Sequence, residues 1–418
     1  MLRPVTRNRK MPNIDKNSLT TDRQFPARRP KLLFVFADDR FFWSHRLPVA
    51  RAALRNGYEV IIATGVYGHA EQIRDEGFRL IPLALIRKNR SLWKEWKAIR
   101  QLRQIYRTEQ PDLLHHVAIK PVLYGSIASL GLPEIRTINA FTGLGYLVAS
   151  PSRKAAFLRL LIWRAFRFLL NRPNKRVLVE NQDDKNLVIT NLKIPSEKVV
   201  LTRGSGVDVD LFQPAPEPAG TPVATLASRM LWIKGVKEFV EAAKLLRAKG
   251  VIARFVLAGD TDTNNPSCVP RKQLLEWQDS GIVEWWGHQR DMPQVFKQAN
   301  LVCLPSHGGE GVPKVLMEAA ACGRAIVTTD VPGCREIVRQ GVNGFIVPPG
   351  DALALTGAIE HLLNDSVTRR QMAVRCREIA VNEFSEAAVV RQTLTLYSEL
   401  LSPRSPSIRA SAHTAAQL

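Results

Sequence analysis

Short apolar segments with the length of buried strands alternate with longer helical segments, and this alternation runs twice along the chain. The first round opens with a strand at 31–36, a polar loop at 37–45, a helix through 46–56 and a strand at 59–63. The second round opens with a strand at 222–227. Strands that alternate with helices form parallel sheets covered by helices on both faces. The sequence therefore predicts an α/β protein with two doubly wound, Rossmann-like domains.

The chain of 418 residues is too long for one compact core, which supports a division into two domains. Three prolines between positions 214 and 218 mark a linker between the two rounds. The expected organisation is a disordered basic tail at 1–30, a first domain at 31–207, a linker at 208–220, a second domain at 221–383, a final helix at 384–401 and a disordered tail at 402–418.

The cysteines indicate where the protein is located. They number five, lie far apart and lack the spacing of metal ligands. Such usage is typical of a reducing compartment and argues against a disulfide framework or a zinc site. Residues 1–30 are polar and basic, without the apolar segment of a signal peptide. We therefore expect a cytoplasmic protein.

The net charge of +21 is concentrated in the amino-terminal half of the chain. Residues 1–31 carry +7, residues 86–107 carry +7 and residues 153–176 carry +8, so that the rest of the chain is almost neutral. Basic patches of this kind bind nucleic acid or anionic membranes. The chain has no recognisable nucleic-acid-binding module, and apolar residues are interleaved with the arginines, which favours the membrane.

The segment 153–170 combines arginines with apolar residues. Arg159, Arg164 and Arg167 exclude a transmembrane helix and fall on one side of a helical wheel. Two interpretations are equally open, namely a basic helix lying on a membrane surface and a buried helix with one wet edge. The aromatic residues that would add apolar anchoring on a membrane are Trp93, Trp96, Phe157, Trp163 and Phe166.

The stretch 305–323 joins a strand at 301–304 to a helix through a loop rich in glycine. Pro313 suits the first turn of that helix, because its missing N–H removes no hydrogen bond there. The amides of Gly311 and Val312 would then point out of the helix N-terminus and offer a site for phosphate.

Two carboxylates flank this expected anion site. Glu310 lies at its mouth, and Glu318 lies about 12 Å further along a helix at about 1.5 Å per residue. A ligand with hydroxyls at both ends and phosphates between them, such as a nucleotide sugar, suits this spacing. Taken alone, two glutamates eight positions apart are more often part of a solvated helix face.

The stretch 305–323 resembles the donor-site motif of glycosyltransferase family 4, the retaining enzymes of GT-B fold, and the likeness continues through 324–333 and 343–348. Residues 120–125 and 139–146 resemble the subgroup that extends glycans on polyprenyl diphosphate. The resemblance implies two Rossmann-like domains facing an interdomain cleft, and a final helix that crosses back to the first domain. It also implies a UDP-sugar donor, a lipid-linked acceptor and no cofactor.

The resemblance assigns roles around the donor. Glu318 would bind the ribose hydroxyls and Glu310 a hydroxyl of the donor sugar. Arg229 and Lys234 would hold the donor diphosphate, where cations stabilise the charge that develops on the leaving group. The remaining donor-binding candidates are Gly311, Val312 and Lys314 near the sugar and phosphates, and Trp286, Gly287 and His288 near the base.

The resemblance also assigns roles in the first domain, where the acceptor would bind. Ser44 and His45 stand where family members usually have two glycines. Lys120 would bind the acceptor diphosphate, and Gly143 belongs to the acceptor-side loop. His115 and His116 are neighbours in a strand, so at most one faces the cleft. We favour His116 as the histidine near the reacting sugar, although a purely structural role is also open.

The resulting hypothesis is a retaining transferase bound peripherally to the inner face of the membrane, which uses lipid-linked acceptors in surface polysaccharide or lipopolysaccharide biosynthesis. One alternative is a UDP-sugar 2-epimerase of the same architecture, and another is a basic nucleic-acid-binding protein. The acidic pairs at 208 and 210 and at 260 and 262 resemble metal-binding pairs of the other large transferase fold. Because the expected donor site supplies its own cations, we expect no metal.

Overall fold

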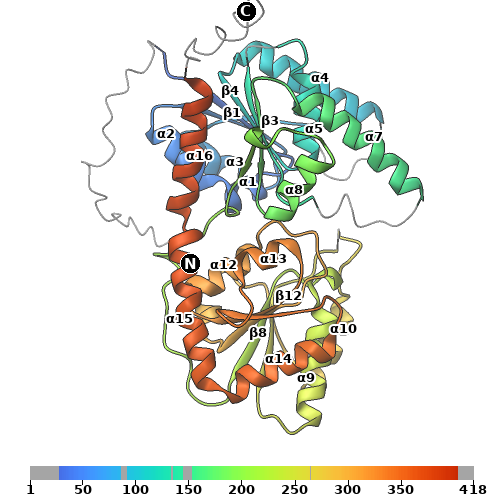
Figure 1. Ribbon diagram of the computed structural model, residues 1–418, viewed down its shortest axis with the longest axis vertical. Helices are drawn as coiled ribbons and strands as arrows, with labels where there is room; N and C mark the ends of the chain where they lie inside the picture. Colours follow the sequence, from blue (N-terminus) through green and yellow to red (C-terminus); the bar gives the residue numbers. More distant parts are fainter. Residues whose placement is uncertain (1–27, 86–91, 133–134, 145–152, 264, 403–418) are drawn as a thin grey trace, which may run out of the picture.

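The computed structural model consists of two α/β domains, one above the other, with the C-terminal helices running along one side of both (Figure 1). The structure describes residues 28–85, 92–132, 135–144, 153–263 and 265–402. Of the tails expected at 1–30 and 402–418, only residues 28–30 and 402 belong to the described part.

The N-terminal domain is built on a parallel sheet of seven strands. Its strands are β1 (Lys31–Val35), β2 (Glu59–Thr64), β3 (Arg79–Pro82), β4 (Leu113–Val117), β5 (Arg136–Ala140), β6 (Lys175–Val179) and β7 (Val199–Leu201). Their order in the sheet is β3-β2-β1-β4-β5-β6-β7. All neighbouring pairs are parallel. The strand order reverses direction beside β1, which places the end of β1 at the point where doubly wound sheets bind ligands.

Helices cover both faces of this sheet. They are α1 (Asp39–His45), α2 (Leu47–Arg55), α3 (Ala70–Asp75), α4 (Leu92–Glu109), α5 (Ile119–Ala128), α7 (Arg153–Leu170) and α8 (Gln182–Thr190). The expectation of a polar loop at 37–45 is wrong, because most of this segment forms α1. The Asp38 side chain caps this helix by accepting from the amide of Arg40 at 3.0 Å. Asp39 accepts from the amides of residues 67–69 at 2.9–3.1 Å, which ties the helix to the loop after β2.

The C-terminal domain repeats this architecture with six parallel strands. They are β8 (Val223–Ala227), β9 (Arg254–Ala258), β10 (Glu284–Gly287), β11 (Leu301–Leu304), β12 (Ala325–Thr329) and β13 (Gly344–Val347), in the order β10-β9-β8-β11-β12-β13. The helices are α9 (Val236–Ala248), α10 (Arg271–Asp279), α11 (Met292–Lys297), α12 (Lys314–Ala321), α13 (Pro332–Ile337) and α14 (Ala352–Asn364). The fold class predicted from the sequence, two Rossmann-like α/β domains of GT-B type, is therefore confirmed.

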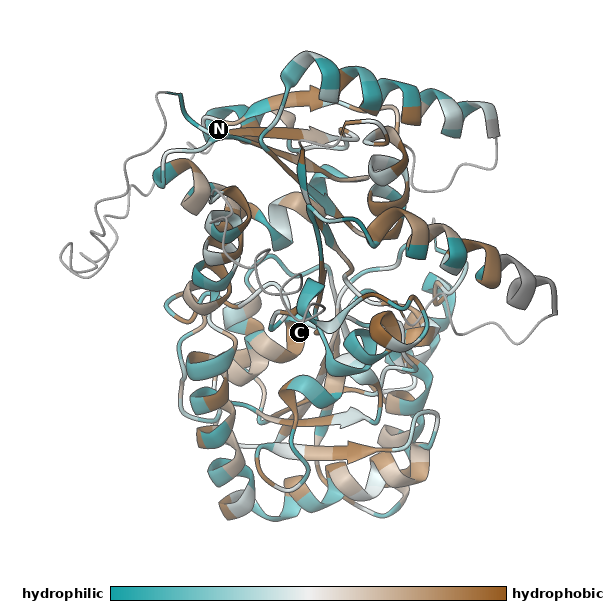
Figure 2. Ribbon diagram, turned by 45° about the horizontal axis from the view of Figure 1, so that its top comes forward, coloured by the Kyte–Doolittle hydropathy of each residue, from teal (hydrophilic) through white to brown (hydrophobic). Residues whose placement is uncertain are grey.

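Both sheets are hydrophobic along their strands, as expected for strands covered on both faces (Figure 2). Two long helices follow the second sheet, α15 (Ser366–Glu383) and α16 (Glu386–Leu401). The latter returns to the N-terminal domain and lies along α2 (Figure 1). Leu396, Tyr397 and Leu400 join the core beneath β1 and β4. The Tyr397 hydroxyl lies 2.6 Å from Nδ1 of His115 in β4, so the last turns of α16 are part of the first domain's core.

Helix α7 extends beyond the body of the N-terminal domain (Figure 1). Its inner side packs through Phe166, Leu169 and Leu170, which are buried. The outer side exposes Leu160, Leu161 and Phe168, so the helix is neither wholly buried nor wholly polar on its free side. The expectation that Phe166 adds apolar anchoring on a membrane is therefore wrong. Within the described residues, no helix is both long and apolar enough to cross a membrane.

Candidate active site

The donor loop, residues 305–313, follows β11 at the carboxyl end of the C-terminal sheet and leads into α12. Pro313 is the N-cap residue of α12, one position before the first helical turn in which the sequence analysis placed it. The loop faces the carboxyl ends of β5 and β6 across the domain boundary. This arrangement puts the ends of strands from both domains around one set of residues, where ligands of doubly wound sheets bind.

Glu310 and Lys234 form the centre of the site. Lys234 ends the short 3₁₀ segment Trp232–Lys234, and its ammonium makes an ion pair with Oε1 of Glu310. The hydroxyl of Ser306 donates to the same carboxylate oxygen at 2.9 Å. Both members of the pair are largely buried, with side chains 18% and 14% exposed. The structure thus brings together an expected phosphate-binding cation and an expected sugar-binding carboxylate.

Gly311 and Val312 lie against the N-terminal domain. A Cβ added at Gly311 would be 2.9 Å from the carbonyl oxygen of Thr142. A Cβ added at Gly143 would be 2.9 Å from the amide nitrogen of Gly311, and φ at Gly143 is +118°. Only glycine fits such a close approach. The structure therefore brings Gly143, an expected acceptor-side residue, to the donor loop.

Lys314 links the two domains at the first turn of α12. Its ammonium donates to the carbonyl oxygen of Ser44 at 2.7 Å. His45 follows, stacked on Phe41 and 2.7 Å from the Ser44 hydroxyl through Nδ1. Burial, together with the nearby charge of Lys314, lowers the pKa of His45 to about 3. His45 is therefore neutral at physiological pH and can act as a hydrogen-bonding group, not as a cation.

Glu318 lies on the second turn of α12. Burial raises its pKa to about 7, the charge of Lys314 opposes that rise, and the charge of Glu386 adds to it. A carboxyl group with such a pKa is half-ionised near neutral pH. A ligand that hydrogen-bonds to the ionised form would lower the pKa again, which suits a residue that accepts hydrogen bonds from hydroxyls.

Arg229 is separated from the ion pair at the centre of the site. It follows β8, its side chain is half exposed, and its guanidinium donates to Asp262 after β9 at 2.7 Å. Asp262, which belongs to one of the acidic pairs that resemble metal-binding pairs, is thus the ion-pair partner of this arginine. Among the described residues, no group of three or more histidine, cysteine or acidic side chains is arranged to hold a metal ion.

The base-side candidates lie at the end of β10, on the same edge of the sheet. Trp286 is half-buried, and its indole nitrogen donates to Glu284 at 3.2 Å. Gly287 has φ of +64° and accepts from the amide of Gly259 through its carbonyl oxygen at 2.8 Å. His288 is exposed. The carboxyl ends of β8, β10 and β11 therefore carry all the donor-side candidates except those on α12.

The expectation that His116 faces the cleft is wrong. The side chain has no exposed surface, Nε2 lies 2.9 Å from the Tyr106 hydroxyl, and Nδ1 lies 2.9 Å from Oδ1 of Asn139. Burial lowers its pKa to about 3. The neighbouring His115 points to the other face, as the strand requires, and meets Tyr397 in the core. Both histidines are therefore structural in this arrangement.

Lys120 lies at the start of α5, where it makes an ion pair with Glu95 of α4 at 2.7 Å. Its ammonium also lies 5.5 Å from the ring centre of Tyr124. The structure does not bring Lys120 to the donor loop. A diphosphate bound here would have to replace or share the contact with Glu95.

Ser306 and His307 also shape the site, although neither was among the site residues predicted from the sequence. His307 lies in the donor loop, and its Nε2 is 3.1 Å from Glu238 of α9. The amide of His307 donates to the carbonyl oxygen of Ile233 at 2.9 Å. Together with Ser306, these contacts bind the loop to the segment that carries Lys234. Only the position of His307 beside the glycines gave a signal in the sequence.

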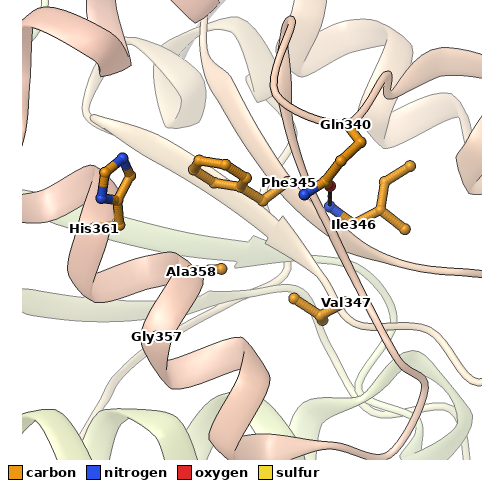
Figure 3. A pocket seen from close by; sticks show the side chains of 7 residues that line it. All are labelled: Gln340, Phe345, Ile346, Val347, Gly357, Ala358 and His361. Atoms are coloured by element: carbon orange, nitrogen blue, oxygen red, sulfur yellow. Dashed lines mark hydrogen bonds between the residues drawn. The ribbon is translucent and has the colours of Figure 1, made fainter.

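Two hollows lie outside this site. An open groove of about 800 Å³ follows α7 and is lined by Trp163, Arg164, Arg167, Phe168 and neighbouring residues. A shallower pocket of about 320 Å³ lies between β13 and α14 (Figure 3). Gln340 closes one side of it, where its Oε1 accepts from the amide of Ile346 at 2.6 Å. None of the expected site residues lines either hollow.

Both domains match known protein families. Residues 221–365 match a family described as glycosyl transferases group 1, and residues 31–178 match one described as glycosyl transferase 4-like. Together the two matches cover well over half of the chain.

Characterised proteins with similar sequences cover most of the chain. An N,N'-diacetylbacillosaminyl-diphospho-undecaprenol alpha-1,3-N-acetylgalactosaminyltransferase of Campylobacter jejuni is 26% identical over 85% of this chain and 95% of its own length. A UDP-Gal:alpha-D-GlcNAc-diphosphoundecaprenol alpha-1,3-galactosyltransferase of Escherichia coli is 23% identical over 78% of this chain and 85% of its own length.

Solved structures share the fold at low sequence identity. A glycosyltransferase from Rickettsia africae aligns with a TM-score of 0.72 and 18% identity over 90% of this chain and 99% of its own. HepE from Anabaena in complex with UDP aligns with a TM-score of 0.71 and 20% identity over 88% of this chain and 100% of its own.

Proposed function

We propose that this chain, which belongs to the family 4 glycosyltransferases of GT-B fold, moves a hexose or N-acetylhexosamine from a UDP-sugar to a glycan on polyprenyl diphosphate. The observation that carries the proposal is the meeting of Lys234 and Glu310 at the ends of the C-terminal strands, opposite Gly143 and Ser44 of the other domain. Gly143 lies against the donor loop beside Glu310, and Ser44 accepts from Lys314 of α12, so acceptor-side residues border the donor side.

The donor would bind along the edge formed by β8, β10 and the donor loop. Lys234 would hold the diphosphate, Glu310 would accept from a sugar hydroxyl, and Glu318 would accept from the ribose. Arg229 would turn from Asp262 toward the diphosphate when the donor enters. Support for a uridine nucleotide comes from HepE, whose structure contains UDP, and from the Escherichia coli relative, named for UDP-Gal.

We infer a retaining reaction. The bond between the sugar C1 and the β-phosphate oxygen breaks, and an acceptor hydroxyl oxygen forms its bond to C1 on the same face. The acceptor proton passes to the departing phosphate, whose charge Lys234 stabilises as it develops. The site itself supplies positive charge to the leaving group, which is why we propose a reaction that needs no metal ion.

A lipid-linked acceptor accounts for the charge of the N-terminal domain. Helix α7 exposes Arg164, Arg167, Leu160 and Phe168 together, a combination that suits the surface of an anionic bilayer. The two relatives described above are named for acceptors on undecaprenyl diphosphate. We therefore place the protein at the inner face of the membrane, bound peripherally, in the synthesis of a surface polysaccharide.

The proposal is tested by incubating purified protein with single UDP-sugars, with and without short glycans on polyprenyl diphosphate. We expect one donor to yield a lipid product extended by one α-linked sugar, and UDP in equal amount. A new UDP-sugar formed without acceptor would instead identify an epimerase. The absence of any extended lipid across the donor and acceptor panel would contradict the proposal.

A further inference from the structure

A carboxylate of the N-terminal domain lies against the donor loop. Glu180 directly follows β6 and is 5% exposed. Its Oε1 accepts from Nη2 of Arg46 at 2.8 Å, and Arg46, between α1 and α2, is 3% exposed. Burial raises the pKa of Glu180, and the charge of Arg46 opposes this rise. Taking two charges out of water to this depth is costly unless good geometry and further hydrogen bonds compensate.

The second oxygen of Glu180 faces the other domain. Oε2 lies 3.5 Å from the amide nitrogen of Val312, and a Cβ added at Gly311 would be 2.3 Å from it. On the other side, a Cβ at Gly333 of α13 would be 1.3 Å from the carbonyl oxygen of Gly311. Gly311 is thus enclosed between a carboxylate of one domain and a helix of the other.

We propose that Glu180, held in place by Arg46, is a positioning residue for the transfer reaction: it docks the donor loop at Gly311 and Val312 against the N-terminal domain. This inference rests on the proposed function. Glu310 precedes Gly311 directly, so fixing Gly311 fixes the backbone from which the sugar-binding carboxylate projects. Donor and acceptor bind to different domains, and their reacting atoms meet only when the domains are held at the correct distance.

The location of the pair explains why it is charged. The amide of Val312 lies just before α12, at the positive end of the helix dipole, where a carboxylate is a favourable partner. From the sequence, this amide was expected to bind phosphate. Glu180 accepts from this amide instead. Lys234 and Arg229 then remain as the cations for the diphosphate, and the Val312 amide helps to hold the two domains together.

A second interdomain contact provides a matched control. Glu336 of α13 accepts from the amide of Gln182 at 2.7 Å and pairs with Arg203 at 2.5 Å. It also joins the two domains through a largely buried carboxylate, but its hydrogen bonds go to Gln182 and Arg203, outside the donor loop. If any interdomain carboxylate suffices for activity, Glu336→Gln and Glu180→Ala should have equal effects.

The experiment compares Glu180→Ala, Glu336→Gln and the double variant Arg46→Met/Glu180→Gln. We expect Glu180→Ala to lower kcat by roughly 100-fold, since a small misplacement has such an effect, with little change in UDP affinity. The double variant keeps an acceptor for Val312 and leaves no lone buried charge, and it should recover about tenfold of the loss. Equal kcat for Glu180→Ala and Glu336→Gln, or parallel loss of UDP affinity and kcat, would overturn the inference.

Small-angle X-ray scattering of the wild type and the variants tests the inference independently of catalytic activity. The wild type and Glu336→Gln should have the same radius of gyration, and Glu180→Ala should have a larger one. Equal radii for all three would refute the positioning role. If the wild type transfers no sugar, the proposed function fails, while the scattering result still decides whether Glu180 holds the domains together.

Discussion

The donor edge of the C-terminal domain and helix α7 of the N-terminal domain differ in how their positive charges are partnered. At the donor edge of the C-terminal domain, Lys234 pairs with Glu310 and Arg229 pairs with Asp262. On α7 of the N-terminal domain, Arg164 and Arg167 are exposed and form no ion pair with any acidic residue in the described part of the chain. The ion pair of Lys234 is largely buried, which holds this cation in a position that suits one small anion. Exposed arginines beside apolar side chains suit a broad anionic surface.

This difference separates the region that catalyses the transfer, the donor edge, from the region that binds the membrane, helix α7. The donor edge holds its charges in a partly buried site, where electrostatic interactions are strong. The charges of α7 lie in water, where salt screens them over about 8 Å. Changes at the donor edge should therefore affect turnover under all conditions, and changes on α7 should matter only when the acceptor is in a membrane.

The largest effect is expected from the central ion pair. Lys234→Ala removes the cation nearest to Glu310 and should lower kcat by roughly 100- to 1,000-fold, the usual loss when one preorganised group for a developing charge is removed. Glu310→Gln should have a similar effect by weakening a sugar contact. Lys237→Ala, an exposed lysine on the adjoining helix α9, is the matched control. Initial rates at saturating donor and acceptor measure the effect; turnover near the wild-type level in both site variants would contradict the assignment.

The next effect concerns α7. Replacing Arg159, Arg164 and Arg167 by Glu should weaken binding to anionic vesicles by roughly 100-fold at low salt, since each basic residue near such a surface contributes about 1 kcal/mol. Vesicle sedimentation measures it, and neutral vesicles and high salt should abolish the binding of the wild type. The control replaces three exposed basic residues of the other domain by Glu, namely Lys272, Arg370 and Arg375. A wild type that ignores anionic vesicles at low salt would refute a membrane role.

A smaller effect follows from the raised pKa of Glu318, which is about 7. Only the ionised carboxylate accepts from both ribose hydroxyls, so affinity for a UDP-sugar should rise about tenfold between pH 6 and pH 8. Glu318→Gln should bind more weakly and without this dependence.

The same raised pKa affects stability. The folded-state pKa of Glu318 lies above the ordinary value of 4.5, so the unfolded chain binds fewer protons than the folded one between pH 4.5 and 7. The wild type should therefore lose stability relative to Glu318→Gln as the pH rises from about 4.5 to 7. Calorimetric titration and thermal unfolding measure the two trends, and a flat affinity profile would show that Glu318 does not contact the ribose.

The smallest effect is expected from chelation. EDTA should leave turnover unchanged, because Lys234 and Arg229 supply the charge that a metal ion would otherwise provide. Rates before and after chelation measure this. Loss of activity that Mn²⁺ or Mg²⁺ restores would show that the donor edge needs a cation beyond its own residues.

The donor loop could be predicted from the sequence because its parts are local. The loop, Pro313 and the carboxylates lie within one strand–loop–helix unit, whose pattern of apolar residues and glycines is visible in the sequence. The alternation of apolar strand-length segments with helical segments likewise predicted β1, β2, β8 and β11. Helix α1 was missed although Asp38 caps it locally, and its attachment to the loop after β2 depends on Asp39, whose partner amides lie 28–30 positions away.

What could not be predicted depends on distant partners. Lys314 meets Ser44 across 270 positions, Glu180 meets Arg46 across 134, and His115 meets Tyr397 across 282. No local pattern encodes such pairs, because they depend on how two domains and a returning helix pack. His116 shows the consequence: a strand allows either face, and the choice was decided by Tyr106 and Asn139.

The division of roles between the donor edge and α7 is tested most directly by measuring transfer to two forms of one acceptor glycan diphosphate. One is a long-chain form in anionic vesicles, and the other is a short-chain, water-soluble form. The variant with Arg159, Arg164 and Arg167 replaced by Glu should lose most transfer in vesicles and keep wild-type turnover on the soluble form, whereas Lys234→Ala should lose both. If the α7 variant loses both activities in equal measure, or neither, the two regions do not divide the work in this way.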